Sequence, residues 1–217
     1  MPTSSQVQPF VILPASVKKG NITNHPISQE YCGPTDESNW IIPHKILASA
    51  YPSAPYDHDG RITRSKIKSM YDAGIRHIVC LQTKSELSKF YDYTSIVQEF
   101  SGLTWLNFEI PDNSSSDDPT IDAFTDRLVD MYHRSHVFMV HCWGGHGRTN
   151  LISAIVLGKI YSLNSKVAIR HVCIYHRCRR RARCEAFSGS FQRAQVRRLL
   201  NYRSQFQAQL QFNTDAN

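Results

Sequence analysis

The chain has 217 residues, 41% of them hydrophobic, and a formal net charge of +7. This length and composition are typical of one globular domain with a sizeable core. The apolar runs are too short to span a membrane, and the N-terminal residues lack the pattern of a secretory signal. The six cysteines are irregularly spaced, unlike the disulfide framework of a secreted domain. We therefore expect a cytoplasmic, intracellular protein without a membrane span.

Apolar periodicity divides the chain into alternating strands and helices. Residues 1–38 are polar and carry scattered prolines, which predicts an irregular N-terminal arm. The elements expected after it are two short strands within 40–48, a helix over 62–73, a strand over 77–81, a helix over about 85–100, a strand over 104–110, a helix over 120–133 and a strand over 137–140. The C-terminal third should be helical, with a domain over 39–205 and a frayed tail over 206–217. This order predicts an α/β fold with a central, mainly parallel sheet flanked by helices on both faces.

The helix expected over 62–73 indicates which of its side chains face the core. Apolar spacing places four of them inward, namely Ile62, Ile67, Met70 and Tyr71. Gly74 should end this helix, because glycine readily adopts the left-handed backbone found just after helix C-termini.

The stretch that carries the chemistry is His-Cys-Trp-Gly-Gly-His-Gly-Arg-Thr-Asn at 141–150. An apolar strand leads into it and an apolar helix leads out, so its glycines let backbone N–H groups converge on one anion at a helix N-terminus. Cys142 is expected at the base of this cradle, where positive charge favours its thiolate as a nucleophile. Arg148 offers a fork of two N–H donors that fits phosphate oxygens. The residues expected to bind the substrate are Trp143, Gly144, Gly145, His146, Gly147 and Arg148.

The pattern His-Cys-x-x-Gly-x-x-Arg-Thr resembles the signature of the cysteine-dependent protein tyrosine and dual-specificity phosphatases. This resemblance implies a cysteine-phosphatase-like fold and hydrolysis of a phosphorylated protein through a phosphocysteine intermediate, with no metal, no cofactor and no stable nucleic-acid complex. Asn150 stands where the family usually has glycine, and we expect it to tune activity. No stretch matches the phosphotyrosine-recognition loop of the large tyrosine-specific domains. A dual-specificity-like enzyme for phosphotyrosine, and also phosphoserine or phosphothreonine, is therefore expected.

The polar loop over 111–119 holds the candidates for the acid that protonates the leaving oxygen. A mobile loop of this kind can bring a carboxyl group in after the substrate binds. Asp112 follows the end of a strand, as does the acid of the resembling phosphatases roughly thirty residues before the cysteine. Asp117 is the alternative acid, while Asp118 is expected to cap the following helix with Asp117 beside it.

Three further residues are expected to assist the nucleophile. His141 should hold the loop and stabilise the thiolate through hydrogen bonds. Thr149 should bond the thiolate and aid the release of phosphate, in addition to capping the helix. Gln192 lies in Ser-Gly-Ser-Phe-Gln, where the family often has a Ser-Pro-x-x-Gln-like stretch. It is a candidate for placing the hydrolytic water, although Gly189 replaces the usual proline.

Two other functions stay open on the sequence. The first is a phosphatase for a non-protein substrate, which would be a phosphoinositide, an inositol phosphate or an RNA 5′ end. Lipid-directed relatives tend to carry lysines inside the signature, and this signature has none. The second is a phospho-binding module without turnover, which the presence of Cys142, Arg148 and Thr149 disfavours.

The segment over 171–198 is rich in histidine, cysteine and arginine. Its candidate metal ligands are His171, Cys173, His176, Cys178 and Cys184, but their spacing lacks the paired short loops of structural zinc sites. Its arginines are Arg177, Arg179, Arg180, Arg181, Arg183, Arg193, Arg197 and Arg198. They predict a basic surface, which either attracts a phosphorylated or acidic partner or keeps a helix face solvated.

Overall fold

The computed structural model describes residues 29–53, 57–180 and 185–201. The predicted arm lies mostly outside these ranges and the predicted tail wholly outside them, so the domain boundaries stay predictions. Arg181, Arg183 and Cys184 are also outside the described residues. No described helix combines the length and the apolar character needed to cross a lipid bilayer.

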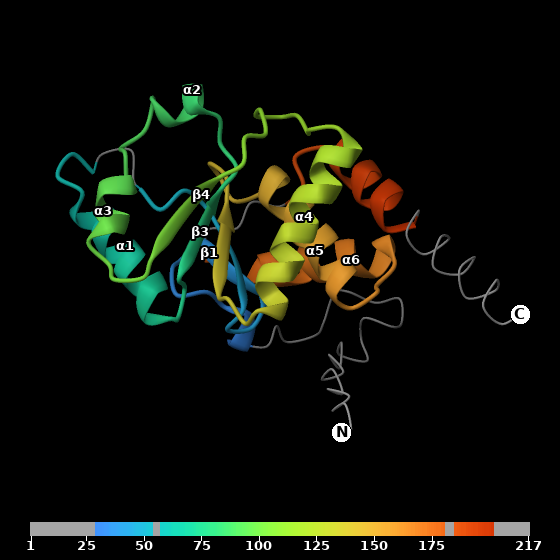
Figure 1. Ribbon diagram of the computed structural model, residues 1–217, viewed down its shortest axis with the longest axis horizontal. Helices are drawn as coiled ribbons and strands as arrows, with labels where there is room; N and C mark the ends of the chain where they lie inside the picture. Colours follow the sequence, from blue (N-terminus) through green and yellow to red (C-terminus); the bar gives the residue numbers. More distant parts are fainter. Residues whose placement is uncertain (1–28, 54–56, 181–184, 202–217) are drawn as a thin grey trace, which may run out of the picture.

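A five-stranded mixed sheet forms the centre of the molecule (Figure 1). Its strands are β1 (Ser38–Ile42), β2 (Ile46–Ser49), β3 (His77–Cys80), β4 (Thr104–Asn107) and β5 (Phe138–His141). They lie in the order β1-β2-β5-β3-β4, with β1 and β2 antiparallel and the other neighbouring pairs parallel. The predicted mainly parallel sheet is therefore confirmed, and β5 lies at its centre.

Helices cover both faces of this sheet, as predicted (Figure 1). They are α1 (Arg61–Asp72), α2 (Lys84–Leu87), α3 (Thr94–Gln98), α4 (Asp118–His133), α5 (Gly147–Ile160) and α6 (Ser165–Tyr175), with the short 3-10 helices η2 (Gln29–Tyr31) and η3 (His176–Cys178). Figure 1 shows α1 and α3 on one side of the sheet and α4, α5 and α6 on the other. Residues 190–201 are also helical.

The strands carry apolar side chains on both faces because both faces are covered. In β5, Phe138 and Val140 pack in the core beneath α4, α5 and α6, while Met139 between them packs in the core on the side of α1 and α3. Nearly all of α5 is buried, as expected for a helix that is apolar all round. Packing from both sides thus fixes the end of β5 and the start of α5, where the 141–150 stretch lies.

The helix predicted over about 85–100 is wrong, because this stretch forms the two short helices α2 and α3. Thr83 and Glu86 form a capping box that starts α2, and the Asp92 carboxylate accepts a backbone N–H at the start of α3 at 2.8 Å. Between the helices the chain turns Tyr93 into the core. Local capping outweighs apolar periodicity here. The break between the helices lets Glu86 contact Arg148 and lets Tyr93 contact His141.

The inward face predicted for the first helix is partly wrong. Ile67 and Met70 are buried, but Ile62 is 49% exposed. The Asp57 carboxylate accepts the backbone N–H groups of Ile62 and Thr63 in the first turn of α1, and Thr63 is the buried member of that pair. The buried face of α1 therefore runs through Thr63, Ile67 and Met70, and Ile62 lies outside this face, toward solvent.

The strand predicted over 104–110 is shorter than expected, since β4 ends at Asn107. The Asn107 side chain donates to the carbonyl groups of Cys80 and Gln82 at 3.0 and 2.9 Å. These bonds hold the ends of β3 and β4 together. The chain then leads into the loop that carries Asp112.

Candidate active site

Cys142 lies between β5 and α5, at the carboxyl edge of the parallel strands. Sheets of this kind bind ligands at that edge, where loop N–H groups and a helix N-terminus meet. Cys142 is buried, with 4% of its surface exposed, and the Thr149 hydroxyl donates a hydrogen bond of 3.1 Å to its Sγ. We call residues 142–148 the signature loop.

A cavity of about 170 Å³ opens above the signature loop. Its lining residues are Asp112, Asn113, Cys142, Trp143, Gly144, His146, Gly147, Arg148, Ser188 and Gln192. The structure thus brings together the proposed nucleophile, the preferred acid candidate and Gln192 from three separate stretches of chain. The volume is roughly that of five or six water molecules, which suits a phosphoryl group with the rest of its ester at the mouth.

Three outward-facing hydrogen bonds orient the backbone of the signature loop. The Cys142 carbonyl accepts from the His141 ring at 3.1 Å. The Trp143 carbonyl accepts from the Tyr51 backbone N–H at 2.8 Å. The Gly145 carbonyl accepts from the Arg179 guanidinium at 2.9 Å. A trans peptide is planar, with its C=O and N–H pointing in opposite directions. The next N–H groups, those of Trp143, Gly144 and His146, therefore point away from the anchors, and these three residues line the cavity.

His141 supports this backbone as a neutral imidazole. Its ring is fully buried, and burial lowers its pKa to about 4. The Trp105 indole donates to the Tyr93 hydroxyl at 2.9 Å, and that hydroxyl lies 2.6 Å from Nε2 of His141. The hydroxyl then donates to Nε2, which leaves the ring proton on Nδ1, facing the Cys142 carbonyl. Both ring nitrogens are thus engaged away from the thiol, so the thiolate bond expected for His141 is absent from the described contacts.

Gly145 does not line the cavity, although the sequence placed it among the substrate-binding residues. Its φ is +68°, a region that favours glycine. A Cβ at this position would also overlap the backbone of Ser49 and Ala50 at the end of β2. Glycine is therefore needed so that the signature loop can pack against β2 and present its neighbours to the cavity.

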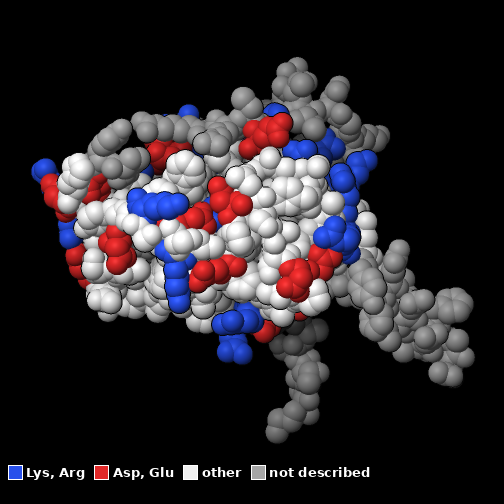
Figure 2. Space-filling view, turned by 90° about the horizontal axis from the view of Figure 1, so that it is seen from above, with Lys and Arg blue, Asp and Glu red and all other residues white. Residues whose placement is uncertain are grey.

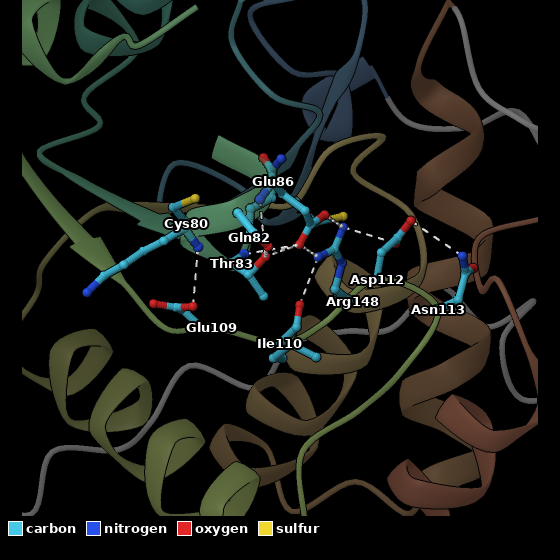
Figure 3. Close-up of polar contacts among 12 residues, drawn as sticks. Cys80, Gln82, Thr83, Glu86, Glu109, Ile110, Asp112, Asn113 and Arg148 are labelled. Atoms are coloured by element: carbon cyan, nitrogen blue, oxygen red, sulfur yellow. Dashed lines mark hydrogen bonds and ion pairs between the residues drawn. The ribbon is translucent and has the colours of Figure 1, made fainter. Parts of the chain in front are cut away.

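The Arg148 guanidinium contacts oxygen atoms of three other residues (Figure 3). Glu86 of α2 accepts two bonds of 2.8 Å, one from each terminal nitrogen. The Ile110 carbonyl accepts from Nη1 at 2.8 Å, and the Asp112 Oδ1 lies 3.0 Å from Nη2. Among the described residues, nothing bonds its Nε–H. Burial raises the pKa of Glu86, but the bonds from Arg148 outweigh it and leave that pKa below its usual range.

The three candidate acids have different environments. Asp112 is half-exposed, lines the cavity and pairs with Arg148. Asp117 is the N-cap of α4 and accepts a first-turn N–H at 2.9 Å, so the capping role predicted for Asp118 is wrong. The helix begins earlier than predicted, at Asp118, whose carboxylate pairs with Arg198 at 2.7 Å. Asp112 is therefore the candidate that the fold brings to the cavity.

Gln192 is buried at the wall of the cavity. Its Oε1 accepts the Ser188 N–H at 3.1 Å, while its Nε2 has no partner among the described residues. Asn150 donates through Nδ2 to the Ala186 carbonyl at 2.5 Å. This bond ties α5 to the segment that carries Ser188 and Gln192, which gives the departure from glycine at position 150 a structural role.

Trp143 and His146 leave the signature loop in different ways. Trp143 is 50% exposed, and its ring lies 6.0 Å from the ring of Phe90. His146 instead turns Nδ1 toward Nε2 of the buried His176, at 2.7 Å. Burial, with Arg179 and His146 nearby, lowers the pKa of His176 to about 3. The Trp143 side chain is therefore exposed, whereas the His146 side chain turns toward His176.

Two arginines of the arginine-rich segment do not add free positive charge to its surface. Arg179 is buried, and Arg198 pairs with Asp118. On the face seen in Figure 2, basic side chains gather along the right edge, while acidic and basic side chains are interspersed elsewhere. Within the described residues, no three His, Cys, Asp or Glu side chains gather as a metal site would require, and His171 bonds the Ile41 carbonyl at 2.9 Å.

Three residues that shape this site could not be recognised from the sequence, namely Glu86, Tyr93 and Arg179. Each reaches the signature stretch from a distant part of the chain. The Thr83-x-x-Glu86 pattern is a readable capping signal, but it indicates nothing about Arg148. No local pattern marks Tyr93 or sets Arg179 apart from its neighbours.

A family profile described as "Swiss Army Knife protein, DSP-PTPase phosphatase domain" matches residues 35–205. No curated protein matches the chain. Among solved structures, Tk-PTP in its active form is 18% identical with a TM-score of 0.57, covering 76% of this chain and 97% of that one. Kinase associated phosphatase, with its catalytic-site cysteine changed to serine, is 19% identical with a TM-score of 0.57 and coverage of 70% and 83%. PTPMT1 in complex with PI(5)P is 12% identical with a TM-score of 0.59 and coverage of 76% and 95%. At these identities the likeness shows a shared fold.

Proposed function

The chain belongs to the cysteine-dependent dual-specificity phosphatase family, as a DSP-PTPase phosphatase domain, and from this premise we propose that it dephosphorylates proteins at phosphotyrosine, and also at phosphoserine or phosphothreonine. Cys142 is the nucleophile, Arg148 and the loop N–H groups bind the phosphoryl group, and Asp112 is the general acid. The observation that carries the proposal is the buried Cys142 thiol at the base of a phosphate-sized cavity, with the Thr149 hydroxyl 3.1 Å from Sγ.

In the first step Cys142 Sγ attacks phosphorus in line with the leaving oxygen. The P–S bond forms as the P–O bond breaks, Asp112 gives its proton to the departing oxygen, and charge builds up on the three remaining phosphoryl oxygens. The N–H groups of Trp143, Gly144 and His146 and the N-terminus of α5 stabilise that charge from fixed positions. The Thr149 hydroxyl stabilises the Cys142 thiolate when it is released again.

Arg148 must exchange one partner when phosphate binds. Glu86 and the Ile110 carbonyl hold it in place, whereas Asp112 is the half-exposed partner and the one that lines the cavity. A phosphate oxygen takes the place of Asp112 on Nη2, and Nε–H supplies the second donor of the fork. This exchange frees Asp112 at the mouth of the cavity, where the leaving oxygen departs.

In the second step water cleaves the phosphocysteine. Asp112, now ionised, accepts a proton from the attacking water, and the electron pair of the P–S bond returns to Cys142. The Gln192 Nε2, which has no partner among the described residues, is a donor that can orient that water. Free phosphate then leaves, and Asp112 is again protonated for the next cycle.

Asp112→Ala should slow hydrolysis of phosphopeptides by about 10²–10⁴ and slow an activated aryl ester such as nitrophenyl phosphate distinctly less. A basic leaving oxygen needs a proton, whereas an activated one does not. The alkaline limb of the pH–rate profile should also flatten, because that limb reports deprotonation of the acid. His141, with its pKa lowered to about 4 by burial, stays neutral above pH 5 and contributes to neither limb there.

Asp117→Ala is the matched control for this experiment. It removes a carboxylate from the same loop, at the cap of α4 and away from the lining of the cavity. Its rates should keep the leaving-group pattern of the wild type. If Asp117→Ala carries the leaving-group dependence and Asp112→Ala does not, the assignment of the acid is wrong.

Trp143 supports an aromatic phosphoester as the preferred substrate. The ring of phosphotyrosine is joined to phosphorus through one ester oxygen, so it lies at the mouth of the cavity, beside the exposed Trp143 indole. Phe90 packs near the indole from the protein side. Trp143→Ala should lower kcat/KM for a phosphotyrosine peptide by about tenfold, as expected for the loss of one aromatic contact. The matched phosphothreonine peptide should lose at most about threefold, because it has no ring to stack.

Phe191→Ala provides the control, because Phe191 is also an exposed aromatic residue but lies outside the lining of the cavity. This variant should hydrolyse both peptides at the wild-type rate. Equal losses on the two peptides in Trp143→Ala would mean that the indole supports the loop and does not read the substrate.

A non-protein phosphate ester is the second candidate substrate. PTPMT1, which has a similar fold, was solved with PI(5)P, but the signature loop of this chain has no lysine to hold additional phosphates. A panel of phosphopeptides, inositol phosphates, phosphoinositide vesicles and 5′-phosphorylated RNA tests the choice. A kcat/KM at least about tenfold higher for any of the last three than for phosphotyrosine peptides would reassign the substrate.

A further inference from the structure

Arg179 is buried, although the arginine-rich segment in which it lies predicts a solvated side chain. It is 4% exposed, and its guanidinium donates through Nε to the Asn39 Oδ1 at 2.7 Å and through Nη1 to the Gly145 carbonyl at 2.9 Å. The next residue, Arg180, has 82% of its side chain exposed and pairs with Asp36 at 3.3 Å. Two adjacent arginines thus have opposite environments, and the buried one reaches the signature loop.

The charge of Arg179 is buried without a salt bridge to any acidic residue of the described part of the chain. No carboxylate of the described residues forms a salt bridge with it, and its Nη2 has no hydrogen-bond partner there. Burial lowers the pKa of Arg179 to about 10, so the guanidinium remains protonated at neutral pH. An unpaired buried charge normally costs several kcal/mol, which indicates that an anion is expected close by.

Cys142 is the group that fits this requirement. The bond from Arg179 to the Gly145 carbonyl places the guanidinium against the loop that begins with Cys142. Burial lowers the pKa of Arg179, whereas the charges of Cys142, Glu37 and Cys178 act to raise it. Glu37 pairs with Lys66 at 3.3 Å, and burial raises the pKa of Cys178, which keeps it a neutral thiol. His176 also faces Arg179 and is neutral, since its pKa lies near 3.

Other titratable groups face Cys142 from the rest of the site. Arg148 is cationic and shared with Glu86 and Asp112. Burial raises the pKa of Cys80 to about 11 and lowers that of His141 to about 4, so both are neutral near pH 7. Arg179 is therefore a cation beside the signature loop that forms no salt bridge with a described carboxylate, although the charge of Glu37 also favours it.

The bond to Gly145 gives Arg179 a second effect. It fixes the carbonyl of the Gly145–His146 peptide on the outer side of the loop, which turns the His146 N–H the other way. His146 lines the cavity, so that N–H is one of the donors available to a phosphoryl oxygen. A guanidinium can bond Asn39 and Gly145 at the same time, whereas an ammonium cannot reproduce this fork.

We propose that Arg179 is a positioning residue of the active site: its charge favours the anionic state of the loop, and its bond to Gly145 aims the His146 N–H at the phosphoryl group. The inference rests on the proposed role of Cys142 as the nucleophile. It also assigns a function to one member of the arginine-rich segment, which the mechanism otherwise leaves unused.

The test compares Arg179→Met with Arg180→Met in the full chain, using readouts that need no turnover. The first readout is the rate at which iodoacetamide alkylates Cys142 at neutral pH, followed by mass spectrometry of its peptide. In Arg179→Met that rate should fall about tenfold, because a positive charge that favours the thiolate is lost. The second readout is the affinity for inorganic phosphate, which should fall about tenfold. Arg180→Met should change neither value.

Arg179→Lys separates the two effects and serves if the methionine variant fails to fold. The lysine keeps the charge, so the alkylation rate should stay near that of the wild type, while the lost fork should still weaken phosphate binding several-fold. Wild-type phosphate affinity in both Arg179 variants, or in Arg179→Lys alone if Arg179→Met does not fold, would overturn the proposal. If the wild type hydrolyses no phosphate ester but these shifts occur, the proposed function fails and the role of Arg179 stands.

Discussion

Replacing Cys142 with serine should abolish hydrolysis and leave the binding of phosphate esters intact. A serine hydroxyl is a poor nucleophile unless a base removes its proton, and the adjacent His141 has both ring nitrogens engaged with Tyr93 and with a backbone carbonyl. Turnover should therefore fall by at least about 10³-fold. The N–H groups of the loop and Arg148 remain, so the affinity for phosphate should change by no more than a few-fold. Steady-state kinetics and a binding titration of the same preparation measure the two quantities.

Cys173→Ser is the control for the loss of a thiol in general. Cys173 is a half-buried residue of α6 that does not line the cavity, and burial raises the pKa of its thiol. That variant should turn over at the wild-type rate. Hydrolysis by Cys142→Ser at a rate comparable to the wild type would remove Cys142 from the chemistry.

Arg148→Lys should lose nearly as much activity as Arg148→Ala, with both losing more than about tenfold, or about 1.4 kcal/mol of transition-state stabilisation. The reason is geometric. The guanidinium binds Glu86 with both terminal nitrogens and the Ile110 carbonyl with one of them, and it still has an edge to offer to phosphate. An ammonium is a compact point charge that cannot bridge Glu86 and a phosphoryl group in the same way.

Both Arg148 variants also leave Glu86 without its partner, so thermal unfolding must be measured beside kcat/KM to show that each variant is folded at the assay temperature. Arg198→Lys is the matched control, because Arg198 pairs with Asp118 on the surface and its exposed ion pair contributes little. It should keep wild-type activity. Retention of more than a tenth of the wild-type rate in folded Arg148→Lys would show that the fork is not used.

The order of strands and helices could be predicted because it depends on local periodicity. The apolar runs before and after the signature loop are β5 and α5, and the alternation of elements gives a sheet covered on both faces. The prediction failed where a polar side chain competes with periodicity. Thr83 caps the start of α2 and Asp92 accepts a backbone N–H at the start of α3, so the stretch forms two helices instead of one. Asp57 sets the first turn of α1 so that Ile62 faces solvent.

The centre of the site could be read from one loop, because Cys142, Arg148 and Thr149 lie within eight consecutive residues of one strand–loop–helix unit. The residues that hold this loop could not. Glu86 reaches Arg148 across 62 positions of sequence, and Tyr93 reaches His141 across 48. Arg179 lies in a run of arginines whose members look alike in sequence, and packing alone decides which of them is buried. Such long-range contacts depend on how the helices and strands are arranged in space.

The central claim is that the phosphoryl group passes through Cys142, and trapping that intermediate tests it most directly. The protein is mixed with an aryl phosphate, quenched in acid during turnover and digested, and the peptides are examined by mass spectrometry. The account predicts one added phosphoryl group on the peptide that contains Cys142, none on the peptide that contains Cys173, and none in Cys142→Ser. Turnover with no phosphoryl group on Cys142, or with the group on another side chain, would contradict it.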